Sequence, residues 1–218
     1  MRPDVRVVGD VAGEALGIFL ETSPRTIQLS GGSTPRDLYL RLAEMDYPWD
    51  EVECFFGDER CVPRDDERSN ARMVEEALLS KVLARAYPMD GEACDADSYE
   101  RTLRDRFGPD LRFDLAIYGL GPDGHTASLF PGRPEVDVTD RWVVHVPEAG
   151  FEPFVPRISL TVPALSAANV GLYLVAGEDK RAALRKLLAG EDVPAARVRP
   201  GRLIVVAEPA AYGGSRGA

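Results

Sequence analysis

The segment Gly119–Gly132 holds the residues whose types and spacing best suit chemistry. It follows an apolar run, Phe113–Tyr118, that predicts a buried strand, and it contains His125, one of only two histidines in the chain. An imidazole can take up a proton and return it near neutral pH, because its unperturbed pKa lies closest to that range. Open α/β sheets place their chemistry just beyond strand ends. We therefore expect His125 to be a catalytic base.

The three glycines of residues 119–124 formally match the dinucleotide-binding fingerprint, but the neighbouring residues argue against that function. Asp123 would place a negative charge against a pyrophosphate. His125 and Thr126 stand where small apolar residues normally begin the packed helix. The better interpretation is a turn that leads into a helix and holds His125 at the mouth of a crevice. Asp123 is then close enough to orient the ring or to raise its pKa.

A second candidate is the loop Ser30–Pro35, between a predicted strand and a predicted helix. Gly31 and Gly32 allow the backbone to approach a ligand closely, and free amides at the helix N-terminus favour a phosphate. Ser33 adds a hydroxyl donor. The alternative is a tight turn in which Ser33 or Thr34 caps the helix. The loop is not a Walker motif, because Gly-Lys-Ser/Thr is missing.

Three basic residues in other segments could contact an anion. Arg60 ends the charged run Asp58–Arg60, where it could bind an anion while the two carboxylates bind sugar hydroxyls. The alternative is a solvated loop, because three consecutive charged residues are unlikely to be buried. Arg157 begins a predicted strand. Lys180 begins a predicted helix, where a cation opposes the helix dipole unless an anion is bound nearby. A solvated surface lysine is the alternative.

The chain has 218 residues, of which 44% are hydrophobic and 28% charged, as in an ordinary globular protein. Its net charge of -10 argues against binding of a nucleic-acid backbone. An anionic small substrate would need a local basic pocket. No apolar run approaches the roughly 20 residues of a membrane span, and the N-terminus lacks a signal peptide's apolar run. We therefore expect a cytoplasmic protein without a membrane segment.

The cysteines and the second histidine predict no further chemistry. Cys54, Cys61 and Cys94 are an odd number without paired metal-ligand spacing, and we expect them to be reduced. His145 interrupts a strand-like run and is expected to be structural. With two histidines and no carboxylate at ligand spacing, no metal site is predicted. The sequence contains no Gly-x-Ser-x-Gly elbow and no cysteine next to His125, so nothing in it supports a covalent mechanism.

Short apolar runs alternate with amphipathic ones along the chain. Strands are predicted over residues 5–8, 26–29, 52–56, 113–118, 142–146, 158–162, 170–176 and 203–206. Helices are predicted over residues 11–20, 35–44, 70–83, 99–107, 163–168 and 179–188. This alternation predicts a single Rossmann-like α/β domain over residues 1–212, with a mostly parallel sheet and helices on both faces. The tail, residues 213–218, is expected to fray.

Several of these segments occur in an order that resembles a known family. They are Leu29–Pro35, Phe56–Arg60, Ser69-Asn70, Gly119–Gly132 and Arg157–Pro163. Together they resemble the 6-phosphogluconolactonases of the glucosamine-6-phosphate isomerase/6-phosphogluconolactonase family over nearly the whole chain. The resemblance implies a NagB-like α/β fold shared with glucosamine-6-phosphate deaminase. It also implies hydrolysis of 6-phospho-D-glucono-1,5-lactone to 6-phospho-D-gluconate in the oxidative pentose phosphate pathway, with no metal and no other cofactor.

The resemblance also implies roles for particular residues. His125 matches the general base of the family, and Arg60 and Asp123 match other pocket positions. Phosphate-contacting positions are matched by Gly31, Gly32, Ser33, Arg157 and Lys180. One departure is the end of the chain, where the family often has a tryptophan and an aspartate after the last strand. Residues 205–209 (Val-Val-Ala-Glu-Pro) stand there instead, which changes the expected local packing but not the chemistry.

The chemistry of a lactone agrees with these residues. A lactone is an ester, so His125 would deprotonate a water for attack at C1 and return the proton to the leaving O5. Backbone amides of the glycine turn would stabilise the oxyanion. A phosphate pocket would supply remote binding energy for orientation.

Two alternatives remain open from the sequence. A glucosamine-6-phosphate deaminase or isomerase would use the same phosphate pocket. According to the resemblance, however, that group continues past its histidine with Asn-Glu-Pro, where this chain has Leu129–Pro131. A non-catalytic phosphosugar-binding protein, like the effector domains of some repressors, is the alternative from another class. Those domains carry DNA-binding helices, whereas this chain is acidic and starts almost at its first strand. The oligomeric state stays open.

Overall fold

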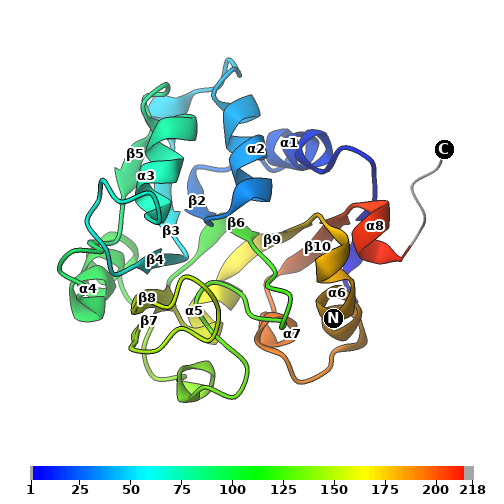
Figure 1. Ribbon diagram of the computed structural model, residues 1–218. Coiled ribbons are helices and arrows are strands. Elements are labelled where there is room, and N and C mark those ends of the chain that lie inside the picture. Colours follow the sequence, from blue (N-terminus) through cyan, green and yellow to red (C-terminus); the bar gives the residue numbers. More distant parts are fainter. Residues whose placement is uncertain (1, 214–218) are drawn as a thin grey trace.

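The computed structural model describes residues 2–213. A seven-stranded sheet crosses the molecule in the order β1-β10-β9-β6-β2-β3-β5, with every neighbouring pair parallel. Its strands are β1 (Asp4–Val7), β2 (Thr26–Leu29), β3 (Glu53–Phe56), β5 (Arg85–Tyr87), β6 (Phe113–Tyr118), β9 (Ala168–Val175) and β10 (Arg202–Ala207). Helices cover both faces (Figure 1). The predicted α/β fold with a mostly parallel sheet is confirmed.

The helices connect these strands. They are α1 (Val11–Thr22), α2 (Ser33–Leu42), α3 (Asn70–Val74), α4 (Ala96–Phe107), α5 (Val162–Ser166), α6 (Arg181–Ala189), α7 (Pro194–Arg197) and α8 (Pro209–Tyr212). Shorter helical turns are η1 (Trp49–Glu51), η2 (Glu75–Leu79), η3 (Pro134–Asp137) and η4 (Glu178–Lys180). Asp10, Ser69 and Asp95 cap α1, α3 and α4 by accepting backbone N–H groups, as carboxylate and hydroxyl oxygens commonly do at helix starts.

A second, three-stranded antiparallel sheet lies beside the first and was not predicted. It consists of β4 (Asp58–Arg60), β8 (Arg157–Leu160) and β7 (Val143–Val146), in the order β4-β8-β7. The register places Arg60 opposite Arg157. The run Asp58–Arg60 is therefore an ordered strand rather than the solvated loop weighed above. β4 pairs with β8, which is about a hundred residues away in sequence, so no local sequence pattern predicts this pairing.

The expectation that the charged run would stay unburied is wrong for its two carboxylates. Asp58 and Glu59 are only 6% and 1% exposed. Glu59 accepts hydrogen bonds from the backbone N–H groups of Arg60, Asn70 and Ala71 and from the hydroxyl of Ser69. Burial of a carboxylate is tolerated when its oxygens are satisfied in this way. Glu59 thus holds the start of α3 against β4.

Three local predictions also fail. Neither Ser33 nor Thr34 caps α2, because the helix begins at Ser33, two residues earlier than predicted, with Gly32 at its N-cap and no side-chain cap. No helix follows His125, since residues 119–133 form a loop closed by its own hydrogen bonds. The helix predicted to reach residue 83 ends at Leu79, and β5 follows it.

The prediction of three reduced cysteines is wrong for two of them. Cys61 and Cys94 form a disulfide with a Cα–Cα distance of 5.2 Å, whereas Cys54 is buried and free. The two partners are separated by 33 residues. They meet because the loop before α4 packs on the end of β4, where a Cβ on Gly91 would lie 2.4 Å from the carbonyl oxygen of Arg60.

Within residues 2–213, no helix is both long and apolar enough to cross a membrane. Apart from Gly213, the tail that was expected to fray lies outside the described residues.

We expect Glu59→Gln to lower the free energy of unfolding by about 1–3 kcal/mol, the usual penalty for a buried polar group left without its partner. Each oxygen of Glu59 accepts at least one backbone N–H, so the amide NH2 of glutamine must face a donor in either orientation. Urea denaturation followed by circular dichroism measures the change. Glu67→Gln, at an exposed position of the same segment, should be neutral. Equal stability of the two variants would contradict the assigned network.

Candidate active site

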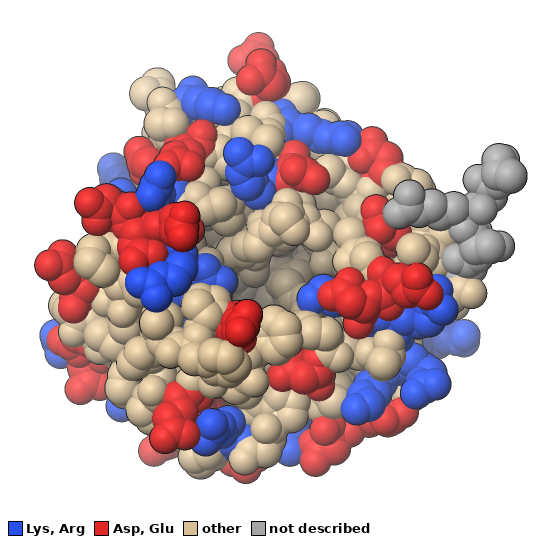
Figure 2. All heavy atoms as spheres, in the orientation of Figure 1, with Lys and Arg blue, Asp and Glu red and all other residues tan. Residues whose placement is uncertain are grey.

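A cavity of about 310 Å³ opens at the carboxyl ends of the central strands. The loops after β2 and β6 line it, together with Asp58 and Arg60 of β4 and with Lys180. Figure 2 shows the hollow near the middle of this face, with basic side chains at its rim. Its volume lies at the lower end of the range for small-molecule sites, and its position at strand ends is where open α/β sheets bind ligands.

His125 lines this cavity and is held by Asp123, as the sequence predicts. Oδ1 of Asp123 lies 2.6 Å from Nδ1 of His125 and also accepts the backbone N–H of His125 at 3.0 Å. With Nδ1–H donating to the carboxylate, the lone pair of the ring is on Nε2. Burial acts to raise the pKa of Asp123, but the hydrogen bond and charge of His125 outweigh it and lower that pKa. The carboxylate therefore stays ionised while it orients the imidazole of His125.

The glycine turn is shaped by the imidazole. The Gly121 N–H donates to the carbonyl oxygen of His125 at 2.8 Å, and the Gly124 N–H donates to that of Gly121 at 3.0 Å. A Cβ on Gly121 would lie 2.0 Å from Nδ1 of His125, so only glycine fits beneath the ring. This close approach explains why glycine stands at position 121, the middle glycine of the three that resemble a dinucleotide fingerprint. The backbone N–H groups of Gly121, Gly124 and His125 already donate to acceptors within the turn. These three amides are therefore not free to donate to a ligand.

The far side of the histidine loop is fastened to β4. The Ser128 hydroxyl donates to Oδ2 of Asp58 at 2.6 Å, and the Ser128 N–H donates to the hydroxyl of Ser159 at 3.1 Å. Between Ser128 and the base, Ala127 adopts φ = 48°, which is uncommon for a residue with a side chain. Such backbone strain persists only where the surroundings fix it, and it clusters at functional sites.

The Gly31–Ser33 loop also lines the cavity, as predicted. Gly32 has φ = 106° and no side chain caps α2, so the first N–H groups of the helix are not satisfied by a cap. Such an end attracts anions. A Cβ on Gly31 would lie 1.9 Å from Oδ1 of Asn70, whose amide Nδ2 donates to Asp58. Asn70 thus fixes the distance between this loop and β4.

Arg60 and Lys180 are the two basic side chains among the described residues that line this cavity. Arg60 donates from Nη1 to the carbonyl oxygen of Arg68, and its Nε is buried with no partner within residues 2–213. Nζ of Lys180 lies 3.3 Å from Oδ2 of Asp179. The turn before Lys180 is held by Glu208, whose Oε2 accepts the Gly177 N–H at 3.0 Å. Glu208 belongs to residues 205–209, the segment in which this sequence departs from the family pattern.

Arg157 is not among the residues that line the cavity. Its side chain is nearly buried, and Nε and Nη2 donate to the carbonyl oxygens of Val155 at 3.1 Å and Pro153 at 2.6 Å. Burial lowers the pKa of Arg157 to about 10, although the charge of Asp58 acts against this shift. Arg157 therefore braces the loop before β8. Its contact with a phosphate stays a prediction that depends on the remaining nitrogen, Nη1.

The braced loop contributes two lining residues that sequence reasoning missed, Phe151 and Glu152. The ring centroid of Phe151 lies 5.7 Å from that of His125, and Phe130 packs on the same imidazole at 4.8 Å. The only signal in the sequence is an aromatic and proline-rich run, Phe151–Pro156, between two strands. That composition is equally common in ordinary loops.

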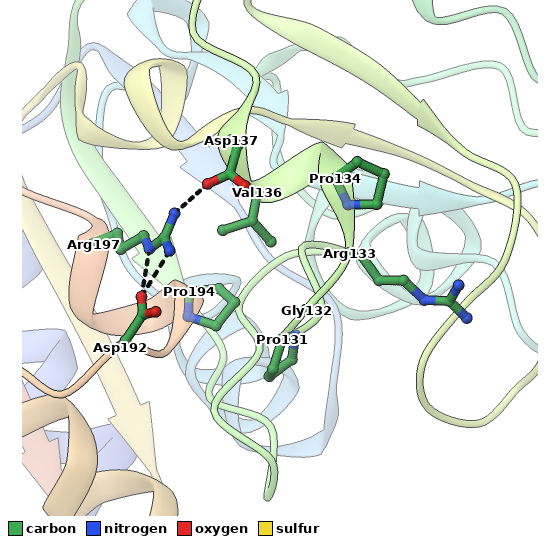
Figure 3. A pocket seen from close by; sticks show the side chains of 9 residues that line it. All are labelled: Pro131, Gly132, Arg133, Pro134, Val136, Asp137, Asp192, Pro194 and Arg197. Carbon is green, nitrogen blue, oxygen red and sulfur yellow. Dashed lines mark hydrogen bonds and ion pairs between the residues drawn. The ribbon is translucent and has the colours of Figure 1, made fainter.

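A hollow of about 390 Å³ beside α7 is a poorer candidate (Figure 3). Its two cations are already neutralised by carboxylates. Arg197 donates to Asp137 at 2.6 Å and to Asp192 at 2.7 and 2.9 Å, and Arg133 pairs with Glu148 at 3.0 Å. An anion would have to break these pairs, so the cavity beside His125 is the better candidate for an active site.

Comparison with known proteins identifies the family of this chain. The family model for glucosamine-6-phosphate isomerases/6-phosphogluconolactonase matches residues 7–206. The chain belongs to this family. Among its relatives, a 6-phosphogluconolactonase of Synechocystis sp. is 40% identical over 185 residues, covering 80% of this chain and 75% of that protein. The family resemblance expected from the sequence is thus confirmed.

Solved structures share the fold. The crystal structure of 6-phosphogluconolactonase from Thermotoga maritima matches with a TM-score of 0.87 and 30% identity, covering 95% of this chain and all of that one. A monomeric glucosamine-6-phosphate deaminase matches with a TM-score of 0.81, covering 98% of this chain and 99% of that one. Its identity is only 20%, so this likeness concerns the fold alone.

We expect Gly121→Ala to displace the imidazole of His125 and to break its hydrogen bond to Asp123, because the added Cβ would overlap Nδ1. Imidazole ¹H–¹⁵N correlation spectra should lose the Nδ1–H signal of His125. The signal of His145, the other histidine, should stay unchanged. Gly119→Ala is the matched control, since its Cβ would approach no atom closer than Ser30 Oγ at 3.4 Å and the Gly31 carbonyl oxygen at 4.0 Å. An unchanged His125 signal in Gly121→Ala would contradict the packing described here.

Proposed function

We propose that this protein hydrolyses 6-phospho-D-glucono-1,5-lactone to 6-phospho-D-gluconate, without a metal ion. The observation that carries the proposal is the 2.6 Å contact between Asp123 and His125 in a cavity with two basic side chains. A relative that is 40% identical over 185 residues is a 6-phosphogluconolactonase, which supports the lactone as the substrate. The family alone would leave the deaminase open, because its model covers both activities.

The chemical step needs a water, a base and a route for one proton. Nε2 of His125 takes a proton from the water, whose oxygen attacks C1 of the lactone. The bond between C1 and the ring oxygen then breaks, and the imidazolium gives its proton to that oxygen. The ionised carboxylate of Asp123 stabilises the imidazolium in between and holds the ring in the required tautomer. The products are one carboxylic acid and one alcohol in the same molecule.

The phosphate of the substrate orients C1 toward His125. We assign it to the uncapped N-terminus of α2, through Gly31, Gly32 and Ser33, together with Arg60 and Lys180. Backbone N–H groups and cations are suited to phosphate oxygens. Binding energy from a remote group can accelerate the reaction when it fixes the geometry of the reacting atoms.

We expect His125→Ala to reduce the enzymatic rate by about 10²–10⁴-fold, the usual contribution of a general base. Acid release from freshly generated lactone would be followed in the presence of a chelator and compared with the spontaneous rate. Wild-type protein should accelerate the reaction, and the variant should keep its circular dichroism spectrum. No acceleration by the wild type would refute the lactonase assignment. Release of ammonia from glucosamine 6-phosphate would favour the deaminase instead.

We expect Lys180→Ala to raise KM by about 10–100-fold with little change in kcat, because a charge-assisted hydrogen bond contributes about 1.5–3 kcal/mol. Lys81→Ala removes the same charge at an exposed position outside the cavity and should leave both constants unchanged. If the two variants behave alike, the phosphate does not contact Lys180.

A further inference from the structure

A second cluster of chemically capable side chains lies outside the cavity, at the edge of the small sheet. Sγ of Cys61, Sγ of Cys94 and a ring nitrogen of His145 all lie within 4.8 Å of one another. Three different segments supply them: the residue after β4, the loop before α4, and β7 (Figure 1). The proposed lactonase chemistry uses none of the three.

The backbone explains why these segments meet. β7 and β4 lie on either side of β8, which pairs Ile158 with both His145 and Glu59. Opposite residues in an antiparallel sheet share a face, and Cys61 lies two residues beyond Glu59 on the same face. The Cys61 N–H continues the ladder by donating to the carbonyl oxygen of Pro156 at 2.8 Å. His145 and Cys61 are therefore held by regular sheet geometry rather than by mobile loops.

His145 is unusual within its strand. Val143, Val144 and Val146 are buried, whereas His145 is exposed. Its ring makes no hydrogen bond with any residue described by the structure, although it lies beside two sulfur atoms. Sequence reasoning assigned it a structural role, but its exposure and lack of partners give it no visible part in holding the fold.

We propose that the dithiol form of this cluster is a binding site for a thiophilic divalent cation of the Zn²⁺ type, with Cys61, Cys94 and His145 as its ligands. Two thiolates and an imidazole are donors that Zn²⁺ prefers, at about 2.3 Å for sulfur and about 2.0 Å for nitrogen. A tetrahedral ion then separates its ligand atoms by roughly 3.5–3.8 Å. Reduction of the Cys61–Cys94 bond lets the two sulfur atoms move apart to this separation, and a ring nitrogen of His145 already lies within 4.8 Å of both.

Charge and exposure fit such an ion. Two thiolates neutralise Zn²⁺, and a neutral imidazole adds no charge, which suits the half-buried setting of both cysteines. The exposed side of His145 leaves the fourth position of the tetrahedron to water. The ion would join the end of β4, directly after Arg60, to the loop before α4. None of its three ligands lines the cavity, so the ion would take no part in the chemistry proposed at His125.

The disulfide and the metal site are alternative states of the same two sulfur atoms. A small dithiol reduces the Cys61–Cys94 bond, giving two protein thiols and its own cyclic disulfide. Zn²⁺ then binds both sulfurs as thiolates and releases two protons to solvent. A small disulfide, as oxidant, takes two electrons from the zinc-bound thiolates and two protons from solvent, and leaves as two thiols. The Cys61–Cys94 bond forms again, which removes two of the three ligands and releases Zn²⁺. Thiol oxidation state therefore controls metal binding.

The test is competition for Zn²⁺ between the full chain and a chromophoric chelator. Reduced wild-type protein, freed of excess reductant under argon, should take one equivalent of Zn²⁺ from the dye, whereas oxidised protein should take none. Cys94→Ser should abolish this uptake. His145→Ala should weaken binding at least about tenfold while keeping both thiols and the fold, because its position is exposed.

Two control variants separate this site from the rest of the molecule. Cys54→Ala removes the third cysteine, whose buried thiol has a pKa raised to about 12, and should not change the uptake of Zn²⁺. His125→Ala should also bind one equivalent. If reduced wild type and Cys94→Ser compete equally, or if His125→Ala alone loses the ion, the proposed site is wrong. Because the readout is binding, it does not depend on the proposed lactonase activity.

Discussion

The geometry of the active site depends on two adjacent carboxylates buried at the start of β4. Asp58 accepts the hydroxyl of Ser128 from the histidine loop and the amide of Asn70, which in turn packs on Gly31. Glu59 receives the first N–H groups of α3. Three loops that would otherwise move independently are thereby held at fixed distances from one another. Since buried carboxylates are costly unless fully hydrogen-bonded, losing one partner would loosen all three.

The parts of the site that sequence predicts are those in which partners are neighbours along the chain. Asp123 and His125 are two residues apart, so their hydrogen bond follows from a tight turn alone. The loop Ser30–Pro35 likewise carries its own signal, because glycines followed by a proline in the first turn of a helix are a local pattern. The alternation of apolar and amphipathic runs is also local, and it was sufficient to predict the parallel sheet.

What the sequence does not predict comes from contacts between distant segments. The pairing of β4 with β8 buries a charged run that reads as a solvated loop when taken alone. The packing of the loop before α4 on the end of β4 brings Cys61 to a partner 33 residues away. Arg157 shows the effect most clearly. Its charge suggests an anion, yet tertiary structure uses two of its nitrogens on backbone carbonyls. Residue type indicates what a side chain can bind, and packing decides which partner it meets.

The difference between what a side chain can bind and the partner that packing gives it also bears on charge. It explains how a protein of net charge -10 could attract the anionic substrate proposed for it. Charges beyond about 8 Å are largely screened at physiological salt, so the potential in the cavity is set by the few groups at its wall. Most arginines at the surface are paired with carboxylates, as Arg197 is with Asp137 and Asp192. Arg60 forms no ion pair with any carboxylate of residues 2–213, and its Nε has no hydrogen-bond partner there. A phosphate bound at the proposed site would therefore meet a cation that it does not have to take from a neighbouring acid.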